Sequence, residues 1–492
     1  MERDYDVIII GAGIGGLTVA NYLARAGVKT AIFEKNKEVG GYLRSFERQG
    51  YTFDAGPTCF GSNGIVRPII EELNLTSEID LLPVKRRIIT DNFNCRVDGT
   101  LDPLEESLLK HYPTEQESLQ QYFTLIDNIS TGLTELFGSQ ILLELGKKPL
   151  RELIELALKE IPFFKEVLKL RHQTNHNLHS HLFSNRELME QLDRIGYPTM
   201  SALYLAGMWY SFQKDYWYPK EGMGDFSAVM ARNYKEWGGH LYLDSPVNEI
   251  IIEDNTVKGI RMGEQQFVAN SVVSNIDLKT TYLELIDDKW VKNKFADKLR
   301  EGRPSKSMFI LYLGLSGKGF DQSPYLSEAS HNSICLKRDG CYRDLSINIT
   351  SLENPDLSPD GEVVTVWTFD EYNNWKESIY NSEGYSQQKQ ARTKEVLDSI
   401  REIIPDLDVR LEVVEAATPL TLNHYTGASG GATGGWSWDP TYQLRFNWFL
   451  EGKIKGLYRS GQWLYNPGGV PTAMLTGRVT AQQIIEGSHQ TF

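Results

Sequence analysis

The sequence predicts an α/β fold in which a Rossmann-type domain is interleaved with a second domain of mixed β-sheet and helices. Three observations support this prediction. The chain opens with a strand, a glycine-rich turn and a helix; strand-like segments return near Gly238 after a long helical stretch; and a short strand, a glycine-rich loop and a helix close the chain. Because 492 residues are too many for one ordinary core, two domains are expected.

The first unit of the Rossmann-type domain lies in "YDVIIIGAGIGGLTVANYLARAGVKTAIFEK". We expect a buried strand over residues 7–10, a glycine turn, a helix over residues 17–26 and a second strand over residues 30–34. This order is a βαβ unit, because a short apolar run is followed by helical periodicity and then by another short apolar run.

The predicted secondary structure changes twice in the middle of the chain. Helical periodicity rich in Leu, Glu and Lys fills residues 101–186, and β-branched runs with turns return from Gly238 to the "VVSNID" segment. Residues 305–320 and 363–369 are expected to be long strands of a second sheet, and residues 384–404 a helix with Val396 and Ile400 on its apolar side.

These patterns divide the chain into two interleaved domains. We assign residues 1–75, 220–285 and 450–492 to the Rossmann-type domain. The second domain then takes residues 76–219 and 286–449, with a helical cap over about residues 101–200.

Composition narrows the classes of partner. The chain has 51 Lys and Arg against 65 Asp and Glu, a net charge of −14, which disfavours nucleic acid and favours small molecules or lipids. The four cysteines are scattered without a C-x-x-C pair, which indicates a reducing compartment. We expect their side chains to be buried in the core of the protein. No signal peptide and no membrane-spanning run is expected, so we predict a cytoplasmic protein and leave attachment to a membrane face open; the sequence sets no oligomeric state.

The glycine turn has the spacing G-x-G-x-x-G at Gly11, Gly13 and Gly16, directly after a strand and at the start of a helix. Such a turn lets backbone approach a pyrophosphate, which the helix N-terminus attracts. Glu34, at the end of the second strand, is placed to accept hydrogen bonds from a ribose diol. The predicted nucleotide-binding residues of this unit are Gly11, Gly13, Ile14, Gly15, Gly16, Glu34 and Lys35.

A second glycine pair, Gly40–Gly41, follows Glu34 within seven residues. In an NAD-binding unit this position leads into another crossover helix. A glycine pair here instead lets the chain run close to a long extended cofactor, which favours FAD over NAD.

Several motifs together resemble the FAD-dependent amine-oxidase-like proteins, and among them the superfamily of phytoene desaturases, carotenoid isomerases and retinol saturases. They are "GAGIGG", "FEKNKEVGG", "GYTFDAGPT", "YPKEGMGDF", "GGHLYLDSPVNEIIIEDNTVKGI", "VVSNID" and "GLYRSGQWLYNPGGVPTAMLTGRVTA". The resemblance implies FAD as cofactor, so that the Rossmann-type domain is an FAD-binding domain and the second domain binds the substrate. It also implies that the backbone of Val247 contacts adenine.

The chain departs from the pattern of this superfamily at three places. Tyr42 follows the glycine pair where many relatives have an arginine, and Arg44 stands two positions further on. In "YPKEG", Glu221 replaces the first glycine of the usual pattern. Near the end of the chain Gln462 stands where many flavoproteins of this fold have an acid.

The loop "GQWLYNPGGVP" is expected to be part of the flavin site. By the resemblance, Gly461 and Gln462 lie beside the ribityl and phosphate groups, and Gly469 and Val470 pass under the ring system. Pro471 suits the first turn of the final helix, whose positive end would then face the flavin pyrimidine.

Catalytic candidates are few, because a flavin carries the reactive atoms itself. The chain shows no Ser-His-Asp arrangement and no H-E-x-x-H motif, and Glu221 is the predicted proton-transferring group because the resemblance puts it near the flavin. The histidines of "RHQTNHNLHSH" have metal-ligand spacing, but we expect a solvated polar face there and predict no metal site.

Two apolar segments each allow two interpretations. The amphipathic pattern over residues 150–170, interrupted at Pro162, suits either the core side of a cap helix, which we favour, or a surface that dips into a bilayer. The aromatic run over residues 202–219 could line a tunnel for a polyene or pack in the core.

The leading functional hypothesis is an FAD-dependent oxidoreductase acting on carbon–carbon bonds of a lipophilic polyene such as a carotenoid or retinoid, by desaturation, saturation or cis/trans isomerisation. A second hypothesis is a tailoring desaturase or amine-oxidase-like enzyme with a small polar or carrier-bound substrate. A third is a non-catalytic binding protein of the same fold, which the intact glycine motifs and Glu34 disfavour. A single-component hydroxylase is disfavoured because its last flavin segment usually precedes a long tail.

Overall fold

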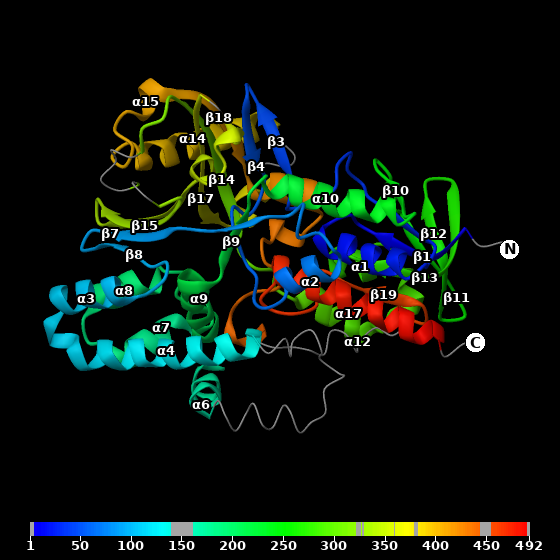
Figure 1. Cartoon of the computed structure of the whole chain (residues 1–492), viewed down its shortest axis with the longest axis horizontal. Helices are drawn as coiled ribbons and strands as arrows, with labels where there is room; N and C mark the ends of the chain where they lie inside the picture. The colour runs from blue at the N-terminus through cyan, green and yellow to red at the C-terminus, as the bar shows by residue number, and fades with distance from the viewer. Residues whose placement is uncertain are drawn as a thin grey trace.

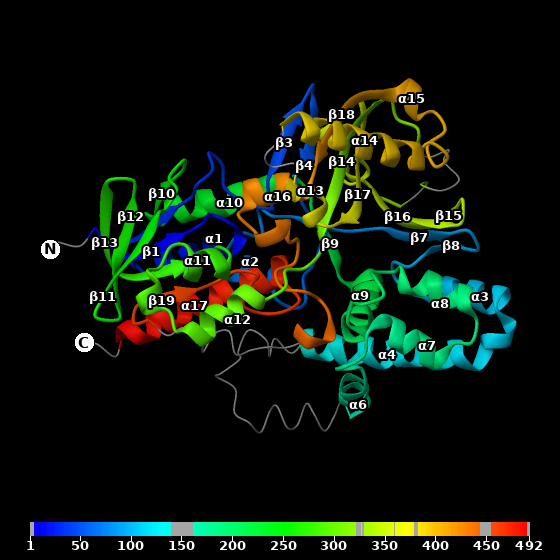
Figure 2. The same cartoon turned by 180° about the vertical axis from the view of Figure 1, so that it is seen from behind.

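The computed structural model describes residues 4–138, 161–320, 326, 329–358, 360–377, 382–442 and 454–489. Two large sheets and a group of helices dominate these residues, and Figures 1 and 2 show them in three regions. One sheet lies among helices α1, α10 and α17, the second is covered by α14, and helices α3 to α9 lie beneath the second sheet in the view of Figure 1.

The first sheet has seven strands among the described residues, in the order β10-β2-β1-β13-β12-β11, with β19 beside β13. The strands are β1 (Tyr5–Ile10), β2 (Thr30–Phe33), β10 (His240–Tyr242), β11 (Glu249–Glu253), β12 (Thr256–Met262), β13 (Gln265–Ser274) and β19 (Leu457–Arg459). β10, β2, β1, β13 and β19 run parallel, and β11 and β12 form an antiparallel hairpin beside them. The parallel strands β1 and β2 are continuous apolar runs because both faces of the sheet are covered.

Three helices pack together against this sheet. They are α1 (Ile14–Arg25), α10 (Met223–Glu236) and α17 (Val470–His489), and α1 contacts both of the others. Because α1 lies between two helices and the sheet, almost all of its side chains are buried. The helix begins at Ile14, earlier than the predicted residue 17, because the glycine turn continues directly into helical backbone.

The second sheet also has seven strands among the described residues, in the order β18-β14-β17-β16-β15-β7-β8. The strands are β7 (Arg86–Thr90), β8 (Asn94–Arg96), β14 (Ser307–Ser316), β15 (His331–Arg338), β16 (Cys341–Ile349), β17 (Gly361–Asp370) and β18 (Leu411–Ala417). The predicted long strands are thus present as β14 and β17. One face is apolar and packs on α14 (Ser382–Ile400), with Val396 and Ile400 in the same core.

Shorter elements join the two sheets. A hairpin of β3 (Ser45–Arg48) and β4 (Tyr51–Asp54) and a three-stranded sheet of β5 (Phe60–Gly61), β9 (Tyr216–Pro219) and β6 (Leu81–Pro83) lie between them. The remaining connecting helices are α2 (Val66–Glu72), α11 (Leu278–Leu283), α12 (Asn293–Glu301), α13 (Asn373–Lys376), α15 (Leu407–Arg410) and α16 (Pro419–Thr426).

The strands of the first sheet all fall within the three segments assigned to the FAD-binding domain, and those of the second sheet within the two segments assigned to the substrate domain. The exact boundaries stay a prediction.

A separate helical region has its own apolar core. Its helices are α3 (Asp102–His111), α4 (Gln116–Gly138), α6 (Ile161–Leu170), α7 (Asn175–Leu182), α8 (Arg186–Asp193) and α9 (Ala202–Lys214). The aromatic run of residues 202–219 lies on α9 and β9, where Trp209 and Tyr218 have no exposed surface. Trp209 donates a hydrogen bond from Nε1 to the hydroxyl of Tyr122 at 2.9 Å, so part of the run is core packing.

The predicted amphipathic segment of residues 150–170 is described only from Ile161 onward. Ile161 and Leu168 are 59% and 61% exposed, so their face of α6 is not the core side that we expected. Phe163 and Leu170, on the opposite side, are buried instead. Pro162 lies in α6, whose described part begins at Ile161. None of the helices that the structure describes is long and apolar enough to cross a membrane.

The histidine segment is the expected solvated face only in part, because His172, His176 and His181 are exposed whereas His179 is buried. His179 has no exposed surface and shares a carboxylate with His176: Nδ1 of His179 lies 2.6 Å and Nδ1 of His176 lies 2.8 Å from the oxygens of Asp193. The sequence spacing could not reveal Asp193, which lies on the next helix. Within the described ranges, no group of three or more potential ligands could hold a metal ion.

Candidate functional site

The turn between β1 and α1 has the geometry of an anion site. Gly11 has a φ of +94°, which favours glycine, and a Cβ on Gly16 would lie 2.1 Å from the carbonyl oxygen of Gly11. Gly13 caps α1 without a side-chain hydrogen bond, and the first turn holds no acidic residue. The free N–H groups and the positive end of the helix therefore face the turn.

Glu34 lies beside this turn with only 6% of its surface exposed. Its Oε2 accepts a hydrogen bond from the N–H of Ala12 at 2.8 Å, and its Oε1 accepts from the N–H and Nδ2 of Asn36 at 2.9 and 2.7 Å. A carboxylate can accept about four hydrogen bonds, so acceptor capacity is left for a ribose hydroxyl. The carboxylate thus also fixes the glycine turn, a role that the spacing of the motif did not predict.

Gly40 and Gly41 lie directly against the first glycine turn. Gly13 and Gly40 form a parallel bridge, and Gly40 and Gly41 have φ values of +106° and +60°. A Cβ on Gly40 would lie 2.1 Å from the carbonyl oxygen of Leu43. The two glycine motifs therefore form one continuous backbone surface without side chains.

Three predicted contact residues, one before this pair and two after it, contact the segment around α16. Nζ of Lys35 donates to the carbonyl of His424 at 2.7 Å, and the Arg44 guanidinium lies 4.3 Å from the ring centroid of Tyr425. The hydroxyl of Tyr42 donates to the carbonyl of Ala432 at 2.9 Å, and burial raises the pKa of Tyr42 above its ordinary value. These contacts fasten the FAD-binding domain to the chain that follows β18.

Val247 lies in the extended segment ahead of β11 and is half-buried. Among the described residues, no backbone hydrogen bond involves its N–H or C=O. Its backbone is thus free for the predicted contact with adenine.

The C-terminal loop meets the glycine turn from the opposite side. The N–H of Gly461 donates to Oγ1 of Thr476 at 2.9 Å, and Gly461 and Gly469 have φ values of +99° and +120°. A Cβ on Gly15 would lie 3.2 Å from the Cα of Gly461. Gln462 is half-buried and Val470 is buried at the start of α17.

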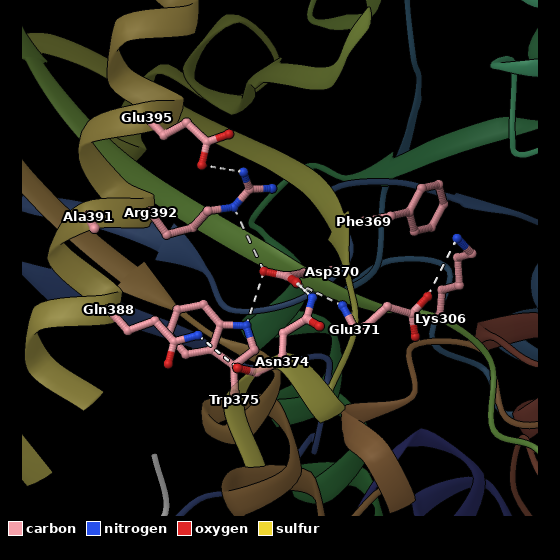
Figure 3. A pocket seen from close by; sticks show the side chains of 10 residues that line it. All are labelled: Lys306, Phe369, Asp370, Glu371, Asn374, Trp375, Gln388, Ala391, Arg392 and Glu395. Carbon is pink, nitrogen blue, oxygen red and sulfur yellow. Dashed lines mark hydrogen bonds and ion pairs between the residues drawn. The ribbon is translucent and has the colours of Figure 1, made fainter. Parts of the chain in front are cut away.

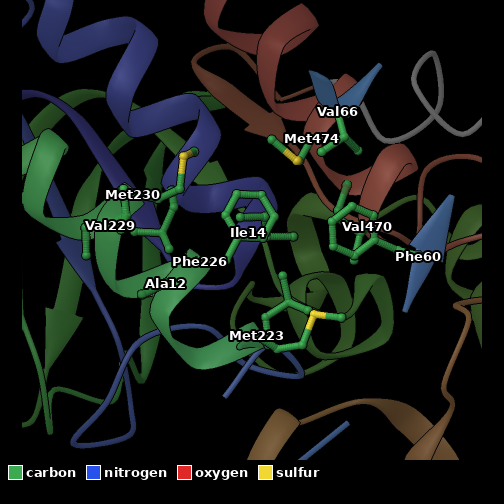
Figure 4. Packing of buried hydrophobic residues seen from close by; sticks show 14 of the residues in the cluster. Ala12, Ile14, Phe60, Val66, Met223, Phe226, Val229, Met230, Val470 and Met474 are labelled. Atoms are coloured by element: carbon green, nitrogen blue, oxygen red, sulfur yellow. The ribbon is translucent and has the colours of Figure 1, made fainter. Parts of the chain in front are cut away.

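Figure 4 shows how these segments converge. Ile14 at the start of α1, Val470 and Met474 on α17, and Phe60 on β5 belong to one buried cluster. The N-termini of α1 and α17 therefore belong to the same packed region, and the loop after β4 lies beside them.

Asn275 is a site residue that the sequence did not single out. It follows β13 in "VVSNID", and its Oδ1 accepts a hydrogen bond from Oγ of Ser460 at 3.0 Å. A Cβ placed on Gly15 would lie 2.5 Å from the same oxygen. The side chain thus fills the space that the glycines leave free behind the turn. The signal in the sequence that could have identified Asn275 is the polar end of the buried strand in "VVSNID".

Asp54 is a second missed residue, on β4 in "GYTFDAG". It is 1% exposed and accepts hydrogen bonds from the hydroxyls of Ser45 at 2.7 Å and Tyr218 at 2.8 Å and from the N–H of Met223 at 3.0 Å. It therefore joins the β3–β4 hairpin to β9 and α10. Glu221 lies in the intervening turn with its side chain exposed, and its catalytic role stays a prediction.

Replacing Asp54 with alanine should lower the free energy of unfolding by about 3 kcal/mol, because three buried donors lose their acceptor. Asp54→Asn should cost no more than about 1 kcal/mol, since an amide can accept from Ser45 and Met223 and donate to Tyr218. Urea unfolding of both variants measures this difference, and equal losses would contradict it.

The contribution of Asp54 to the free energy of unfolding should also depend on pH. Burial raises the pKa of the Asp54 carboxyl, and the hydrogen bonds oppose this shift. The folded protein therefore keeps the proton to a higher pH than the unfolded chain, whose Asp value is about 3.9. The wild-type free energy of unfolding should fall as the pH rises between these two values, and Asp54→Asn should lack this contribution.

Gly468→Val tests the C-terminal loop. A Cβ on Gly468 would lie 2.6 Å from the carbonyl oxygen of Gly434, so the loop that holds Gly469 and Val470 must shift. We expect FAD affinity to fall about 10-fold, or the reduction potential of the bound flavin to change. Flavin absorbance after dialysis and a redox titration measure both, and a variant with unchanged occupancy and potential would contradict the placement of the loop.

A pocket of about 520 Å³ lies elsewhere, between the end of β17, α13 and α14 (Figure 3). Arg392 reaches across it, with NH1 2.7 Å from Glu395 and Nε 3.8 Å from Asp370. None of the predicted site residues lines this pocket, so we do not assign the substrate to it.

The residues at the glycine turn fit FAD. The open N-terminus of α1 suits a pyrophosphate, Glu34 retains acceptor capacity for a ribose, and a second side-chain-free surface at Gly40–Gly41 extends the site. Any Cβ at Gly15, Gly16 or Gly40 would collide with neighbouring atoms.

Known proteins give the same assignment. Residues 14–485 match the family described as flavin containing amine oxidoreductase. The chain is 26% identical to an all-trans-retinol 13,14-reductase of Danio rerio, over 99% of this chain and 86% of that one. It is 22% identical to prolycopene isomerase 2 of an Oncidium hybrid cultivar (98% and 84% covered) and 26% identical to a lycopene-forming phytoene desaturase of Pseudescherichia vulneris (67% and 66%). These matches confirm the resemblance and FAD as the cofactor.

Solved structures confirm the fold. The chain superposes on cyclohexylamine oxidase from Brevibacterium oxydans with a TM-score of 0.65, at 16% identity, over 99% of this chain and 100% of that one. The structure of putrescine oxidase bound to putrescine superposes with a TM-score of 0.65 at 16% identity, over 98% of this chain and 99% of that one. The likeness extends over both sheets and the helical region.

Proposed function

Because the chain belongs to the family of flavin-containing amine oxidoreductases, we propose that it is an FAD-dependent oxidoreductase that acts on carbon–carbon bonds of a lipophilic polyene. The reaction is a desaturation, a saturation or a cis/trans isomerisation. The finding that carries this proposal is the near full-length match to proteins named for retinol reduction and prolycopene isomerisation. A phytoene desaturase match over two thirds of the chain adds support.

FAD, when bound, supplies the hydride chemistry, so the task of the protein is to hold, orient and shield it. The glycine turn and Glu34 would hold the pyrophosphate and ribose. The N-terminus of α17 would present its positive end to the ring system, with Gly469 and Val470 close to it. Glu221 is proposed as a proton-transferring group on the exposed turn after β9.

The proposed substrate is a lipophilic small molecule. We also propose that the protein contacts a membrane surface peripherally. Ile161 and Leu168 support this contact, because α6 exposes both large apolar side chains on one side. Sedimentation with phosphatidylcholine vesicles tests it: the wild type should pellet with the vesicles and Leu168→Glu should remain in the supernatant. Equal pelleting of the two proteins would contradict the contact.

An anaerobic experiment tests the reaction. The bound flavin is reduced, candidate polyenes such as retinol, phytoene and prolycopene are added, and the flavin absorbance is followed together with product geometry. Reoxidation of the flavin or a change of isomer supports the proposal. If every lipophilic alkene is inert while an amine or a polar metabolite is oxidised, the amine-oxidase-like alternative replaces it. A purified protein without bound flavin would instead indicate the non-catalytic binding protein.

A further inference from the structure

Arg86, the first residue of β7, is a buried cation without a carboxylate partner. It is 6% exposed, and within the part of the chain that the structure describes no Asp or Glu oxygen lies within 4.0 Å of its guanidinium. NH1 donates to Oγ of Ser333 at 3.2 Å and NH2 donates to Sγ of Cys59 at 3.4 Å, whereas the buried Nε has no hydrogen-bond partner. A thiol is a weak acceptor, so the positive charge is poorly compensated.

Asp98 and Glu353 are engaged with other groups. Asp98 accepts from the backbone N–H of Arg86 at 3.1 Å and pairs with Arg96. Glu353 accepts a hydrogen bond from Ser330. The side chain of Arg86 therefore keeps its charge and unused N–H groups in an interior position, which is unfavourable unless an anion binds there.

Arg86 begins a polar row that crosses the second sheet. Strand register aligns Arg86 with His331, His331 with Asn348, Asn348 with Thr365 and Thr365 with Tyr312. These five side chains stand on one face of the sheet, opposite the apolar face that packs on α14. All five are buried, so polar groups replace apolar ones along a whole interior row.

Two members of the row hold the loop between β4 and β5. Nε2 of His331 lies 3.0 Å from the carbonyl oxygen of Thr58, and the hydroxyl of Tyr312 donates to the carbonyl of Ala55 at 2.7 Å. Burial, together with the charge of Arg86, lowers the pKa of His331 to about 3, so this histidine is neutral and adds no second charge. The fully buried Oγ1 of Thr365 has no hydrogen-bond partner. Arg86 and Thr365 thus retain polar groups that the fold does not use.

The guanidinium lies close to the predicted flavin region. Cys59, which it contacts, precedes Phe60, and β5 contacts α17, with Phe60 and Val470 in one buried cluster (Figure 4). The rings of Phe212 and Tyr216 flank the guanidinium at 4.6 and 4.9 Å. Cys59 and Tyr216 are themselves half-buried.

We propose that Arg86 binds the carboxylate of an amphipathic substrate, whose unsaturated chain then extends from this anchor toward the flavin region. The proposal rests on the proposed function and narrows its substrate class from a neutral polyene to an unsaturated acid. The planar fork of arginine suits a carboxylate, and the aromatic side chains of α9 and β9 beside it suit a conjugated chain.

Binding of matched probes to the FAD-loaded protein tests this assignment. The probes are all-trans-retinoic acid and its methyl ester, with 2,4-hexadienoic acid and its methyl ester as a shorter pair, and binding is followed by the change in flavin absorbance and by tryptophan fluorescence. The wild type should bind at least one acid about 10- to 100-fold more tightly than its ester. Arg86→Gln should abolish this preference by weakening the acid alone, and Arg86→Lys should retain part of it.

Arg87→Gln is the matched control, because neighbouring residues of a strand point to opposite faces. Its acid preference should equal that of the wild type, and flavin content and the melting temperature should show that all three variants are folded. Wild-type binding of each ester as tight as its acid, no binding of either acid, or an equal loss of acid and ester in Arg86→Gln would overturn the proposal.

Binding and turnover separate this proposal from the proposed function. If Arg86 selects acids but no alkene reoxidises the reduced flavin or changes isomer, the carbon–carbon chemistry fails and the carboxylate site stands. If neutral polyenes turn over equally in wild type and Arg86→Gln and no acid preference is seen, the carboxylate site fails and the proposed function stands.

Discussion

Gly16→Ala is expected to yield protein almost free of FAD. The new Cβ would lie 2.1 Å from the carbonyl oxygen of Gly11 and 2.9 Å from Nδ2 of Asn275, so the turn that faces the pyrophosphate must open or α1 must move. Either movement should cost considerable free energy, because α1 is buried between the sheet, α10 and α17. We expect FAD affinity to fall about 100-fold or more, measured by flavin absorbance per protein and by titration of the apoprotein.

Gly207→Ala in α9 is the control for Gly16→Ala. No atom lies within 4 Å of its ideal Cβ, and alanine favours a helix interior over glycine. Its flavin content should equal that of the wild type, and its melting temperature should be equal or slightly higher. Full flavin content in Gly16→Ala would remove the glycine turn from the cofactor site.

Glu34→Gln is expected to have the second largest effect. Each carboxylate oxygen of Glu34 now accepts a hydrogen bond from an N–H group, at Ala12 on one side and Asn36 on the other. A glutamine must turn its NH₂ group toward one of these donors, which leaves that donor unpaired and removes an acceptor for the ribose. We expect FAD affinity to fall about 100-fold, with a smaller loss for flavin mononucleotide, which lacks the adenosine half.

Glu38→Gln makes the same chemical change four residues away. The Glu38 side chain is 63% exposed and lies 3.8 Å from Arg44, so its loss should change FAD affinity by less than about 3-fold. Isothermal titration of FAD into each apoprotein compares the two variants. Equal affinities of Glu34→Gln and the wild type would show that the carboxylate does not serve the nucleotide.

The cofactor site was the part most open to prediction from sequence. Gly11, Gly13 and Gly16 bring a strand, a tight turn and a helix N-terminus together within a few residues, and the structure has β1, the turn and α1 there. The strong apolar strands of both sheets were equally visible, since continuous burial leaves a continuous apolar run. Cofactor identity followed from the second glycine pair and from the family resemblance.

Other features depended on partners that are remote in the chain. His179 looked solvated because the segment around it is polar, yet Asp193 from the next helix makes its burial tolerable. Ile161 and Leu168 looked like core residues, yet the helical region buries the opposite side of α6. Periodicity shows which residues share a face, and only packing decides which face is covered.

The sequence by itself determined the α/β class and the glycine turn between β1 and α1, because turn geometry and contiguous apolar runs depend on neighbouring residues. The second glycine pair and the family resemblance indicated FAD. The tertiary structure alone showed Asn275 behind the glycines, Asp54 between three elements, and the row from Arg86 to Tyr312. These arise from strand register and loop packing between residues that are not neighbours in the sequence. Burial makes these polar side chains important for stability, because a charge that has lost its hydration needs a partner inside the fold.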